Sequence, residues 1–436
     1  MLNEQLKQHG VVGAGGAGFP TYVKAKSQVE FVLANGAECE PLIHKDVELM
    51  QHFPEEIVNG MMLMMNATGA RQGKFGVKEK HHEAIDALTP FIKKNSAVEF
   101  SLLGDFYPSG DEYELVYAAT GRLIPPAGLP LNVGCVVNNV ETLFNIHQAS
   151  HNIPVTEKFI SIAGSVHTPS SFRVPIGISF REVIEAAGGA TVGEFGIFIS
   201  GLMMGTLSFD LDTIVTKTTA GLILLPKEHF LVSRKNQSQS TMNRIGKSAC
   251  DQCSYCTEFC PRYLLGYEVQ PHKVMRSLGF TQMGTQHWNQ WAELCCSCGL
   301  CTLYACPEDL FPKEACDQGK KEMKKEGIKF VQQKEVRVHP MKEMRRVPQS
   351  QLRKRLGVED CDTPFNNREF YPRSVKINLS QHVGKPANPI VHVGDRLRKG
   401  NVVATVGESD LGVNIHASID GAVSNSTESF IEITAA

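Results

Sequence analysis

The chain has 436 residues, which at roughly 100 to 200 residues per domain allows several domains with hydrophobic cores of their own. Its 44 Lys and Arg nearly balance its 46 Asp and Glu, so the overall charge gives no reason to expect nucleic acid or an anionic membrane as a partner. No segment approaches the ~18 consecutive apolar residues of a membrane helix, and the N-terminus lacks the apolar stretch of a secretory signal. We therefore expect a cytoplasmic protein without a membrane span.

The first part of the chain, residues 1–150, alternates between helical and strand patterns. Such alternation is typical of an α/β domain with a mainly parallel sheet. The expected elements are, in chain order, a glycine-rich turn, an apolar run at 29–34, a helical pattern at 44–65, an apolar run at 75–77, helical patterns at 80–94 and 110–121 on either side of a strand at 98–103, and a buried strand at 132–137.

The pattern changes after this domain. Short strand-like runs around one helix, which Gly188 and Gly189 end, indicate a compact α+β module at 155–232. Residues 233–247 are polar and are interpreted as a linker. Residues 245–320 carry most of the cysteines, and 371–436, rich in Val, Ile and turn residues, predict a small all-β domain.

A basic segment joins the last two units. Between Lys320 and Arg355 thirteen Lys or Arg face four Glu. Such a run is typical of a solvated helical linker, and the alternative is a docking surface for an acidic partner. We place this linker at 321–370.

The cysteines form two arrays of the ferredoxin type. The first is C-x2-C-x2-C-x3-C-P and the second is C-x2-C-x2-C-x4-C-P, and in such arrays the last cysteine binds the neighbouring cluster. We therefore predict two [4Fe-4S] clusters. The first is held by Cys250, Cys253, Cys256 and Cys306, and the second by Cys295, Cys298, Cys301 and Cys260.

Zinc is the alternative ligand for paired cysteines, but two three-fold arrays that each end in Cys-Pro favour iron–sulfur clusters. Cys296 is a surplus thiol that we interpret as a bystander. Cys39, Cys135, Cys316 and Cys361 are interpreted as packing residues.

Four glycines occur within six residues near the N-terminus, at positions 13, 15, 16 and 18, and Pro20 and Lys24 follow. Backbone without side chains can approach a phosphate or a flat ring, and a helix that starts near Pro20 would point N–H groups toward it. The segment matches neither a dinucleotide-binding nor a Walker motif, so a flexible surface loop remains the alternative.

Four motifs together resemble a known family. The loop at 13–24 is followed by Asn35-Gly-Ala-Glu-Cys-Glu-Pro41, Tyr107-Pro-Ser-Gly-Asp-Glu112 and Asn138-Asn-Val-Glu-Thr142. In this order they resemble the flavin-binding motifs of the 51 kDa subunit of respiratory complex I and, more closely, those of the C subunit of Rnf ferredoxin:NAD oxidoreductases. The resemblance implies an FMN-binding α/β domain with NADH as electron donor.

The resemblance also implies which residues hold the cofactors, while no catalytic residue is identified. Lys24 would pair with the FMN phosphate, Asn35 would approach the flavin ring, and Gly110, Asp111 and Glu112 would lie where nicotinamide stacks. The implied cofactor-binding residues are Gly13, Gly15, Gly16, Gly18, Lys24, Asn35, Glu38, Tyr107, Gly110, Asp111, Glu112, Asn138, Asn139 and Thr142. Ala14 and Ala37 replace an arginine and an aspartate of complex I, so the resemblance supports FMN better than NADH.

The resemblance extends to the other domains. Residues 155–232 resemble the β-grasp (SLBB) domain of these relatives, 245–320 a dicluster ferredoxin-like domain, and 371–436 a barrel-sandwich hybrid. The turn Ser418-Ile-Asp-Gly421 lacks the lysine of biotinyl and lipoyl carriers, so we expect no covalent cofactor there.

The position of the barrel-sandwich domain at the end of the chain resembles the cobalamin reductases of propanediol-utilisation bacterial microcompartments. That family implies electron transfer from NADH, through FMN and two clusters, to cobalamin, with an adenosyltransferase and shell proteins as partners. Two alternatives stay open. One is an Rnf C-like subunit with ferredoxin or another redox protein as acceptor, and the other is an electron-transfer adaptor without NADH chemistry of its own.

Overall fold

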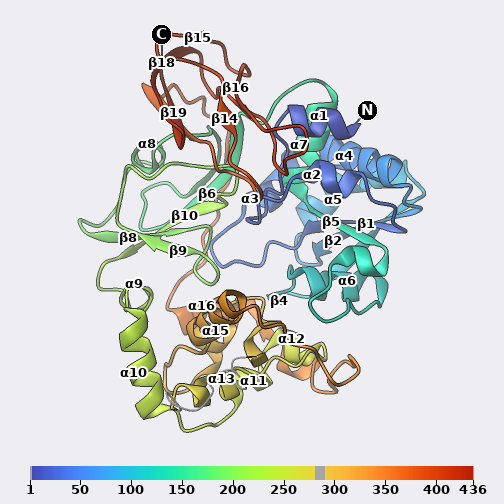
Figure 1. The fold of residues 1–436 in the computed structure, drawn as a ribbon, viewed down its shortest axis with the longest axis vertical. Helices are drawn as coiled ribbons and strands as arrows, with labels where there is room; N and C mark the ends of the chain where they lie inside the picture. Colours follow the sequence, from blue (N-terminus) through green and yellow to red (C-terminus); the bar gives the residue numbers. More distant parts are fainter. Residues whose placement is uncertain (1, 280–289, 436) are drawn as a thin grey trace.

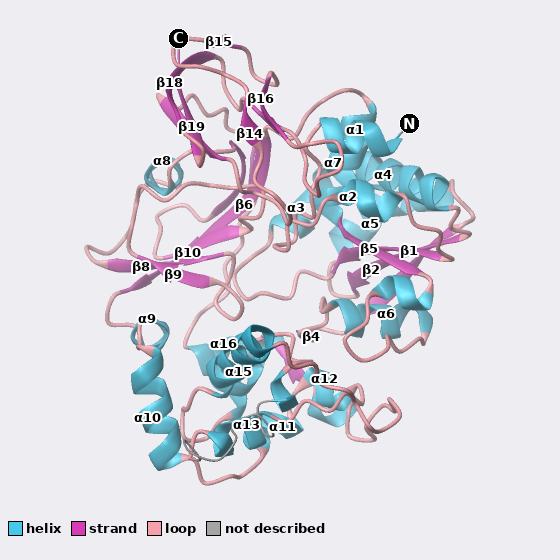
Figure 2. Ribbon diagram, in the orientation of Figure 1, coloured by secondary structure: helices cyan, strands magenta, loops and turns pink. Residues whose placement is uncertain are grey.

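The computed structural model describes residues 2–279 and 290–435. Four units surround a central junction in Figure 1, where the N-terminal α/β domain is blue, the β-grasp domain green, the cysteine-rich domain yellow to orange and the C-terminal β domain red. Figure 2 shows that helices dominate the cysteine-rich unit and strands the C-terminal one. None of the described helices is long and apolar enough to cross a membrane.

The N-terminal domain is built on a parallel four-stranded sheet in the order β3-β2-β1-β5, as the alternating pattern predicts. Helices cover the sheet, and α4 packs against α7. The elements are α1 (Leu2–Gln8), α2 (Thr21–Ala25), β1 (Phe31–Gly36), α3 (Lys45–His52), α4 (Pro54–Thr68), β2 (Gln72–Lys78), α5 (His82–Lys93), β3 (Val98–Leu103), β4 (Phe106–Tyr107), α6 (Glu112–Thr120), η1 (Pro130–Val133), β5 (Cys135–Asn139) and α7 (Val140–Ser150).

The β-grasp domain packs one helix on a mixed sheet in the order β12-β7-β6-β10-β8-β9. Ser179 and Glu182 form a capping box that starts this helix, since each side chain bonds the backbone N–H of the other. The elements are β6 (Glu157–Gly164), β7 (Ser170–Pro175), α8 (Phe180–Ala186), β8 (Phe195–Ile199), β9 (Thr206–Ser208) and β10 (Gly221–Pro226).

The cysteine-rich unit consists of short helices around two loops. The polar segment 233–247, interpreted from the sequence as a linker, is helical, and that prediction was wrong. Ser238 caps the N-terminus of α10, and Met242 and Gly246 are buried on its inner face, so a narrow apolar stripe suffices to dock the helix. The elements are α9 (Phe230–Lys235), α10 (Gln239–Ala249), α11 (Tyr255–Glu258), α12 (Pro261–Leu264), α13 (Pro271–Ser277), η2 (Gln290–Ala292), η3 (Cys301–Ala305) and α15 (Pro312–Glu326).

The basic segment after this unit is tied to other domains. Strand β11 (Val347–Pro348) pairs with β4 of the N-terminal domain, and β12 (Phe365–Asn366) extends the β-grasp sheet beside β7. Between them lie η4 (Glu343–Arg345), which precedes β11, and α16 (Gln349–Leu356), whose Leu352 and Leu356 are fully buried. Its charges are partly paired inside the protein, because Lys342 forms a buried ion pair with Glu114 at 2.5 Å.

The C-terminal domain is all-β, as predicted, with two sheets in the orders β13-β19-β18-β15 and β14-β16-β17 around one apolar core. It contacts both neighbours, because Val383 N donates to Gly18 O at 2.9 Å and Ser418 Oγ to Ile176 O at 2.6 Å. The strands are β13 (Ser374–Asn378), β14 (Asn388–Pro389), β15 (Arg396–Leu397), β16 (Val402–Thr405), β17 (Ile415–His416), β18 (Gly421–Ser426) and β19 (Phe430–Ala435).

Candidate flavin and iron–sulfur sites

The glycine-rich segment forms a closed loop. Gly13 N donates to Phe19 O at 2.8 Å, and Gly18 N donates back to Gly13 O at 3.1 Å. Gly16 and Gly18 have φ of +110° and +63°, which L side chains rarely adopt, and a Cβ on Gly15 would lie 3.3 Å from Cβ of Asn139. Gly15 and Gly16 are exposed at the tip, so the loop presents bare backbone beside the end of β5.

The asparagines predicted for flavin binding lie at the carboxyl ends of two paired parallel strands. In the register of β1 and β5, Asn35 stands opposite Asn139. Asn35 Nδ2 donates to Gly110 O at 2.9 Å, which brings the third motif to the same edge. Asn138 is 2% exposed, and within the described residues neither its Nδ2 nor its Oδ1 has a hydrogen-bond partner. A buried amide without partners is costly, so this site fits a polar ligand.

Lys24 and Thr142 complete this edge. Lys24 Nζ donates to Val137 O at 2.6 Å, and burial lowers its pKa while the nearby Glu112 carboxylate opposes that shift. Thr142 Oγ1 accepts from Ala14 N at 3.0 Å and so fixes the glycine loop to α7. The four sequence motifs therefore meet at one place, with a lysine available for a phosphate.

Two predicted acidic residues lie beside the loop in different settings. Glu38 accepts from the backbone N–H groups of Asp46 and Val47 at 2.9 and 2.8 Å, and burial together with the Asp46 carboxylate raises its pKa well above the usual range. Burial also raises the pKa of Glu112, against the attraction of Lys24. Both carboxyl groups therefore resist ionisation more than a free glutamate.

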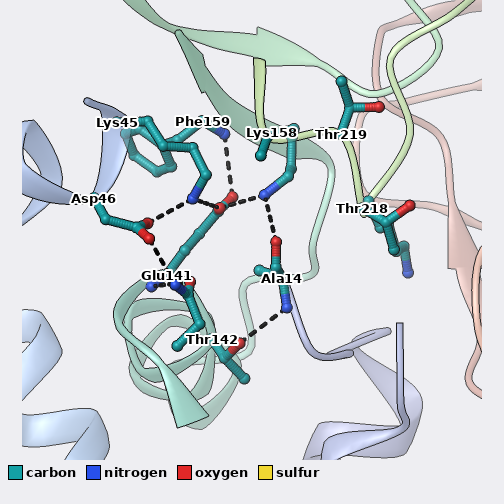
Figure 3. A network of polar contacts seen from close by, with 12 residues as sticks. Ala14, Lys45, Asp46, Glu141, Thr142, Lys158, Phe159, Thr218 and Thr219 are labelled. Atoms are coloured by element: carbon teal, nitrogen blue, oxygen red, sulfur yellow. Dashed lines mark hydrogen bonds and ion pairs between the residues drawn. The ribbon is translucent and has the colours of Figure 1, made fainter. Parts of the chain in front are cut away.

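A buried ion network supports the loop from below, and the sequence analysis did not predict it. Glu141 joins Lys158 of β6 to Lys45 of α3, and Lys45 also pairs with Asp46 at 2.5 Å (Figure 3). Lys158 Nζ donates to Ala14 O at 3.2 Å. The β-grasp domain therefore contacts the glycine loop through a lysine side chain that is 1% exposed.

The charges of this network compensate one another. Burial alone would raise the pKa of Glu141, but Lys158 and Lys45 outweigh it and hold the pKa below its usual value. Burial lowers the pKa of Lys158 to about 8 despite Glu141. The signal available in the sequence was Glu141, which belongs to the fourth motif, whereas Lys45 and Lys158 resemble ordinary surface lysines in the sequence.

The eight predicted cluster ligands are grouped in the structure as the array spacing suggests. Cys250, Cys253, Cys256 and Cys306 line one cavity, and the other three surround the Cys256 thiol. Around the second site, Cys301 faces Cys295 and Cys260, and Cys298 faces Cys301 and Cys260. In the described part of the chain, no three metal-binding side chains converge closely enough to hold a single ion.

Backbone N–H groups point at several of these sulfurs. Ser297 N donates to Cys295 Sγ at 3.3 Å and Leu310 N to Cys306 Sγ at 3.4 Å. The backbone of Arg262 and Tyr263, at the start of α12, faces the Cys260 thiol. Donors of this kind favour thiolates, which are the form that binds iron. The loops therefore fit iron–sulfur ligation.

Two of the thiols interpreted as surplus lie close to the second site. Cys296 contacts Cys298, and Cys316 shares a hydrogen bond with Cys295. Both residues border the ligands, so the second site is richer in sulfur than the array pattern alone indicates.

The second cysteine set adjoins the predicted flavin motifs. Tyr107 Oη donates to Cys298 O at 2.6 Å, and Arg262 bonds the Asp111 carboxylate at 2.8 Å. The first set lies nearer to solvent, since Cys253 is exposed. The arrangement thus leads from the glycine loop to the second set and then to the surface.

Each domain matches a family model. Residues 6–148 match the Nuo51 FMN-binding domain, 159–205 the SLBB domain, 249–311 the 4Fe-4S dicluster domain and 365–434 the RnfC barrel sandwich hybrid domain. These matches identify FMN and two [4Fe-4S] clusters as the cofactors. Fold and sites therefore define an oxidoreductase that contains flavin and iron–sulfur clusters.

Curated relatives narrow this class. The cobalamin reductases PduS of Citrobacter freundii and Salmonella typhimurium are 41% and 42% identical over 435 residues, 99% of this chain and 96% of theirs. The chain belongs to this PduS family. The RnfC-type component of the Na(+)-translocating ferredoxin:NAD(+) oxidoreductase complex of Acetobacterium woodii is 33% identical over 60% of this chain and 58% of its own.

A solved NAD+-reducing [NiFe]-hydrogenase in the H2-reduced state has a related fold. The TM-score is 0.50 at 18% identity, over 82% of this chain and 67% of the hydrogenase chain. At this identity the likeness concerns the fold alone.

Proposed function

We propose that this protein is a cobalamin reductase that passes electrons from NADH, by way of FMN and two [4Fe-4S] clusters, to the cobalt of cobalamin. The observation that carries the proposal is the pair of contacts from the flavin motifs to the second cysteine set, Tyr107 to Cys298 and Asp111 to Arg262. The names of the PduS relatives support cobalamin as the acceptor.

FMN would be held where the four motifs meet. The glycine loop offers exposed backbone, Lys24 a positive charge for the phosphate, and Asn138 an amide without a partner in the described structure. When bound, FMN accepts electrons in pairs and releases them singly, which links a hydride donor to one-electron clusters. Thr142 and Lys158 would keep the loop in place, because they bond both sides of the Ala14 peptide.

We propose that electrons reach the second cluster first and leave from the first cluster. The second set borders the flavin motifs and its Cys260, Cys298 and Cys301 are buried, whereas the first set includes the exposed Cys253. This order would keep the electron entry side away from solvent and place the exit side where an acceptor can approach.

We also propose that the protein works in a propanediol-utilisation microcompartment, with an adenosyltransferase and shell proteins as partners. Support comes from the PduS family membership. Co-purification of the tagged chain with isolated microcompartments would test this placement, and its recovery only outside them would contradict it.

The proposed activity is tested by an anaerobic NADH titration of protein that carries FMN and both clusters, followed by absorption spectroscopy. We expect bleaching of the flavin band, then loss of the broad iron–sulfur absorption, and finally reduction of added cob(III)alamin. If NADH reduces the clusters but cobalamin is not reduced, while ferredoxin is, an Rnf C-like role replaces the proposal. If NADH leaves the flavin oxidised, the protein is an adaptor.

A matched pair of variants tests the flavin site. Asn138→Ala removes the buried amide, so we expect at least a ten-fold weaker affinity for FMN, in line with the roughly 1–3 kcal/mol of a hydrogen-bonded buried group. Asn66→Ala, at an exposed position of α4 in the same domain, serves as the control. Equal FMN affinities of the two variants, measured by equilibrium dialysis, would remove Asn138 from the site.

A further inference from the structure

Arg262 occupies a special place between the two redox sites. Its guanidinium bonds Asp111 at 2.8 Å, in an ion pair whose side chains are 10% and 11% exposed. It also lies over the Tyr113 ring, with Cζ 3.4 Å from the ring centroid, and contacts Cys296. One short helix therefore carries both a predicted cluster ligand, Cys260 at its N-cap, and the arginine that reaches the flavin motif.

The geometry fixes this positive charge on both sides. Asp111 caps α6, where its Oδ2 accepts from Tyr113 N and Glu114 N at 3.2 and 3.3 Å, while its Oδ1 accepts from Arg262. The Nε of Arg262 is buried and, among the described residues, has no hydrogen-bond partner. A planar guanidinium held by a carboxylate and an aromatic ring keeps one orientation. Its remaining donors face the sulfur-rich side.

A fixed positive charge beside an iron–sulfur cluster affects its reduction. Each electron that enters adds one negative charge to the cluster, so a nearby cation stabilises the reduced form and raises the reduction potential. Burial strengthens the effect, because little water screens the charge. Under the proposed function the incoming electron is supplied by the reduced flavin.

We propose that Arg262 is a positioning residue that couples the flavin pocket to the second cluster: it holds Asp111 in place and sets the potential of that cluster high enough to accept electrons from the flavin. The proposal rests on the proposed assignment of Cys260, Cys295, Cys298 and Cys301 to one cluster. It assigns no role to NADH or cobalamin.

The test is a redox titration of the cluster-loaded protein with dithionite and mediators, monitored by electron paramagnetic resonance. The second-cluster signal is identified as the one that Cys298→Ala removes. We expect Arg262→Gln to move the midpoint potential of this cluster to a more negative value and Arg262→Lys to restore part of the shift. Asp111→Asn, which exposes the arginine charge, is expected to move it in the opposite direction.

Arg234 provides the matched control. It is also a buried arginine over an aromatic ring, Phe311 at 4.7 Å, but it lies near Cys306 of the first set and bonds Leu310 O at 3.0 Å. Arg234→Gln is therefore expected to shift the first cluster and leave the second unchanged. The proposal is overturned if Arg262→Gln retains iron and FMN with an unchanged second-cluster potential, or if all substitutions shift both clusters alike. Because mediators replace NADH and cobalamin, failure of the proposed activity leaves this result interpretable.

Discussion

Lys217 is a buried lysine at the junction of three domains. It is 2% exposed, and its Nζ donates to Gly10 O at 2.7 Å and to Asn414 O at 3.4 Å, so it joins the β-grasp domain to the N-terminal and C-terminal domains. Burial lowers its pKa from the ordinary 10.5 to about 7. The imidazoles of His416 and His382 face it, and burial lowers the pKa of each.

This lysine predicts a pH-dependent stability. Between pH 7 and 10.5 the unfolded chain holds a proton on Lys217 that the folded chain lacks, so its contribution to stability rises with pH across this window, by up to about 1.4 kcal/mol per pH unit. Lys217→Met removes the proton, so we expect its melting temperature relative to wild type to be highest near pH 6 and to fall as the pH rises. Lys227→Met, at an exposed position, is the control, and parallel curves for Lys217→Met and wild type would refute the assignment.

At the level of residues, the sequence predicted the flavin edge better than its support. Asn35, Lys24 and the Asn138 motif meet because they follow strands that pair in parallel, and that register can be inferred from a sequence pattern. Lys158 could not be found in this way. A lysine is placed on the surface by default, and only the approach of Glu141 from another domain makes its burial favourable.

Among the elements, the packing of α4 on α7 depends on one glycine. A Cβ on Gly60 would lie 1.9 Å from Leu143 O, so the two helix backbones touch at this point. Since α7 carries Glu141 and Thr142, this contact also supports the flavin edge. Helices in such close contact have no room for even one methyl group.

Gly60→Ala is therefore expected to push the two helices apart, at a cost of about 1–3 kcal/mol, and to weaken FMN retention. The measurement is the temperature at which the flavin is released, followed by its fluorescence. Gly193→Ala, where a Cβ would meet nothing within 4 Å, should leave this temperature unchanged. A Gly60→Ala protein that releases FMN at the wild-type temperature would show that the helices can separate without cost.

Short elements were the hardest to predict. The two-residue strands β11 and β12 have no periodicity of their own, and their partners β4 and β7 lie far away in the sequence. The helix α10 was missed because its polar composition outweighs an apolar stripe of two buried residues. Tertiary partners decided these elements, whereas the long strands and helices of the N-terminal domain carried their own signal.

The whole molecule presents its two cysteine sets differently to solvent. Cys253 of the first set is exposed, whereas Cys260, Cys298 and Cys301 of the second are buried. The order of four domains followed from motifs and composition, but their mutual contacts did not, because single hydrogen bonds such as Val383 N to Gly18 O leave no pattern in a sequence.

The difference in exposure predicts unequal sensitivity to oxygen. On exposure to air we expect the first cluster to lose iron before the second, since oxidants reach exposed sulfur first. Reduced samples withdrawn over time and examined by electron paramagnetic resonance would report the two signals separately. Earlier loss of the second-cluster signal would contradict both this expectation and the proposed order of electron transfer.

The glycine loop is among the first segments to leave the ribosome, yet its partners are synthesised much later. Ala14 waits for Thr142 and Lys158, and Gly18 waits for Val383, near the end of the chain. A nascent chain therefore cannot close the flavin pocket while it is still being translated. FMN must be taken up after synthesis is nearly complete, and a chain that stops before the C-terminal domain leaves the pocket open.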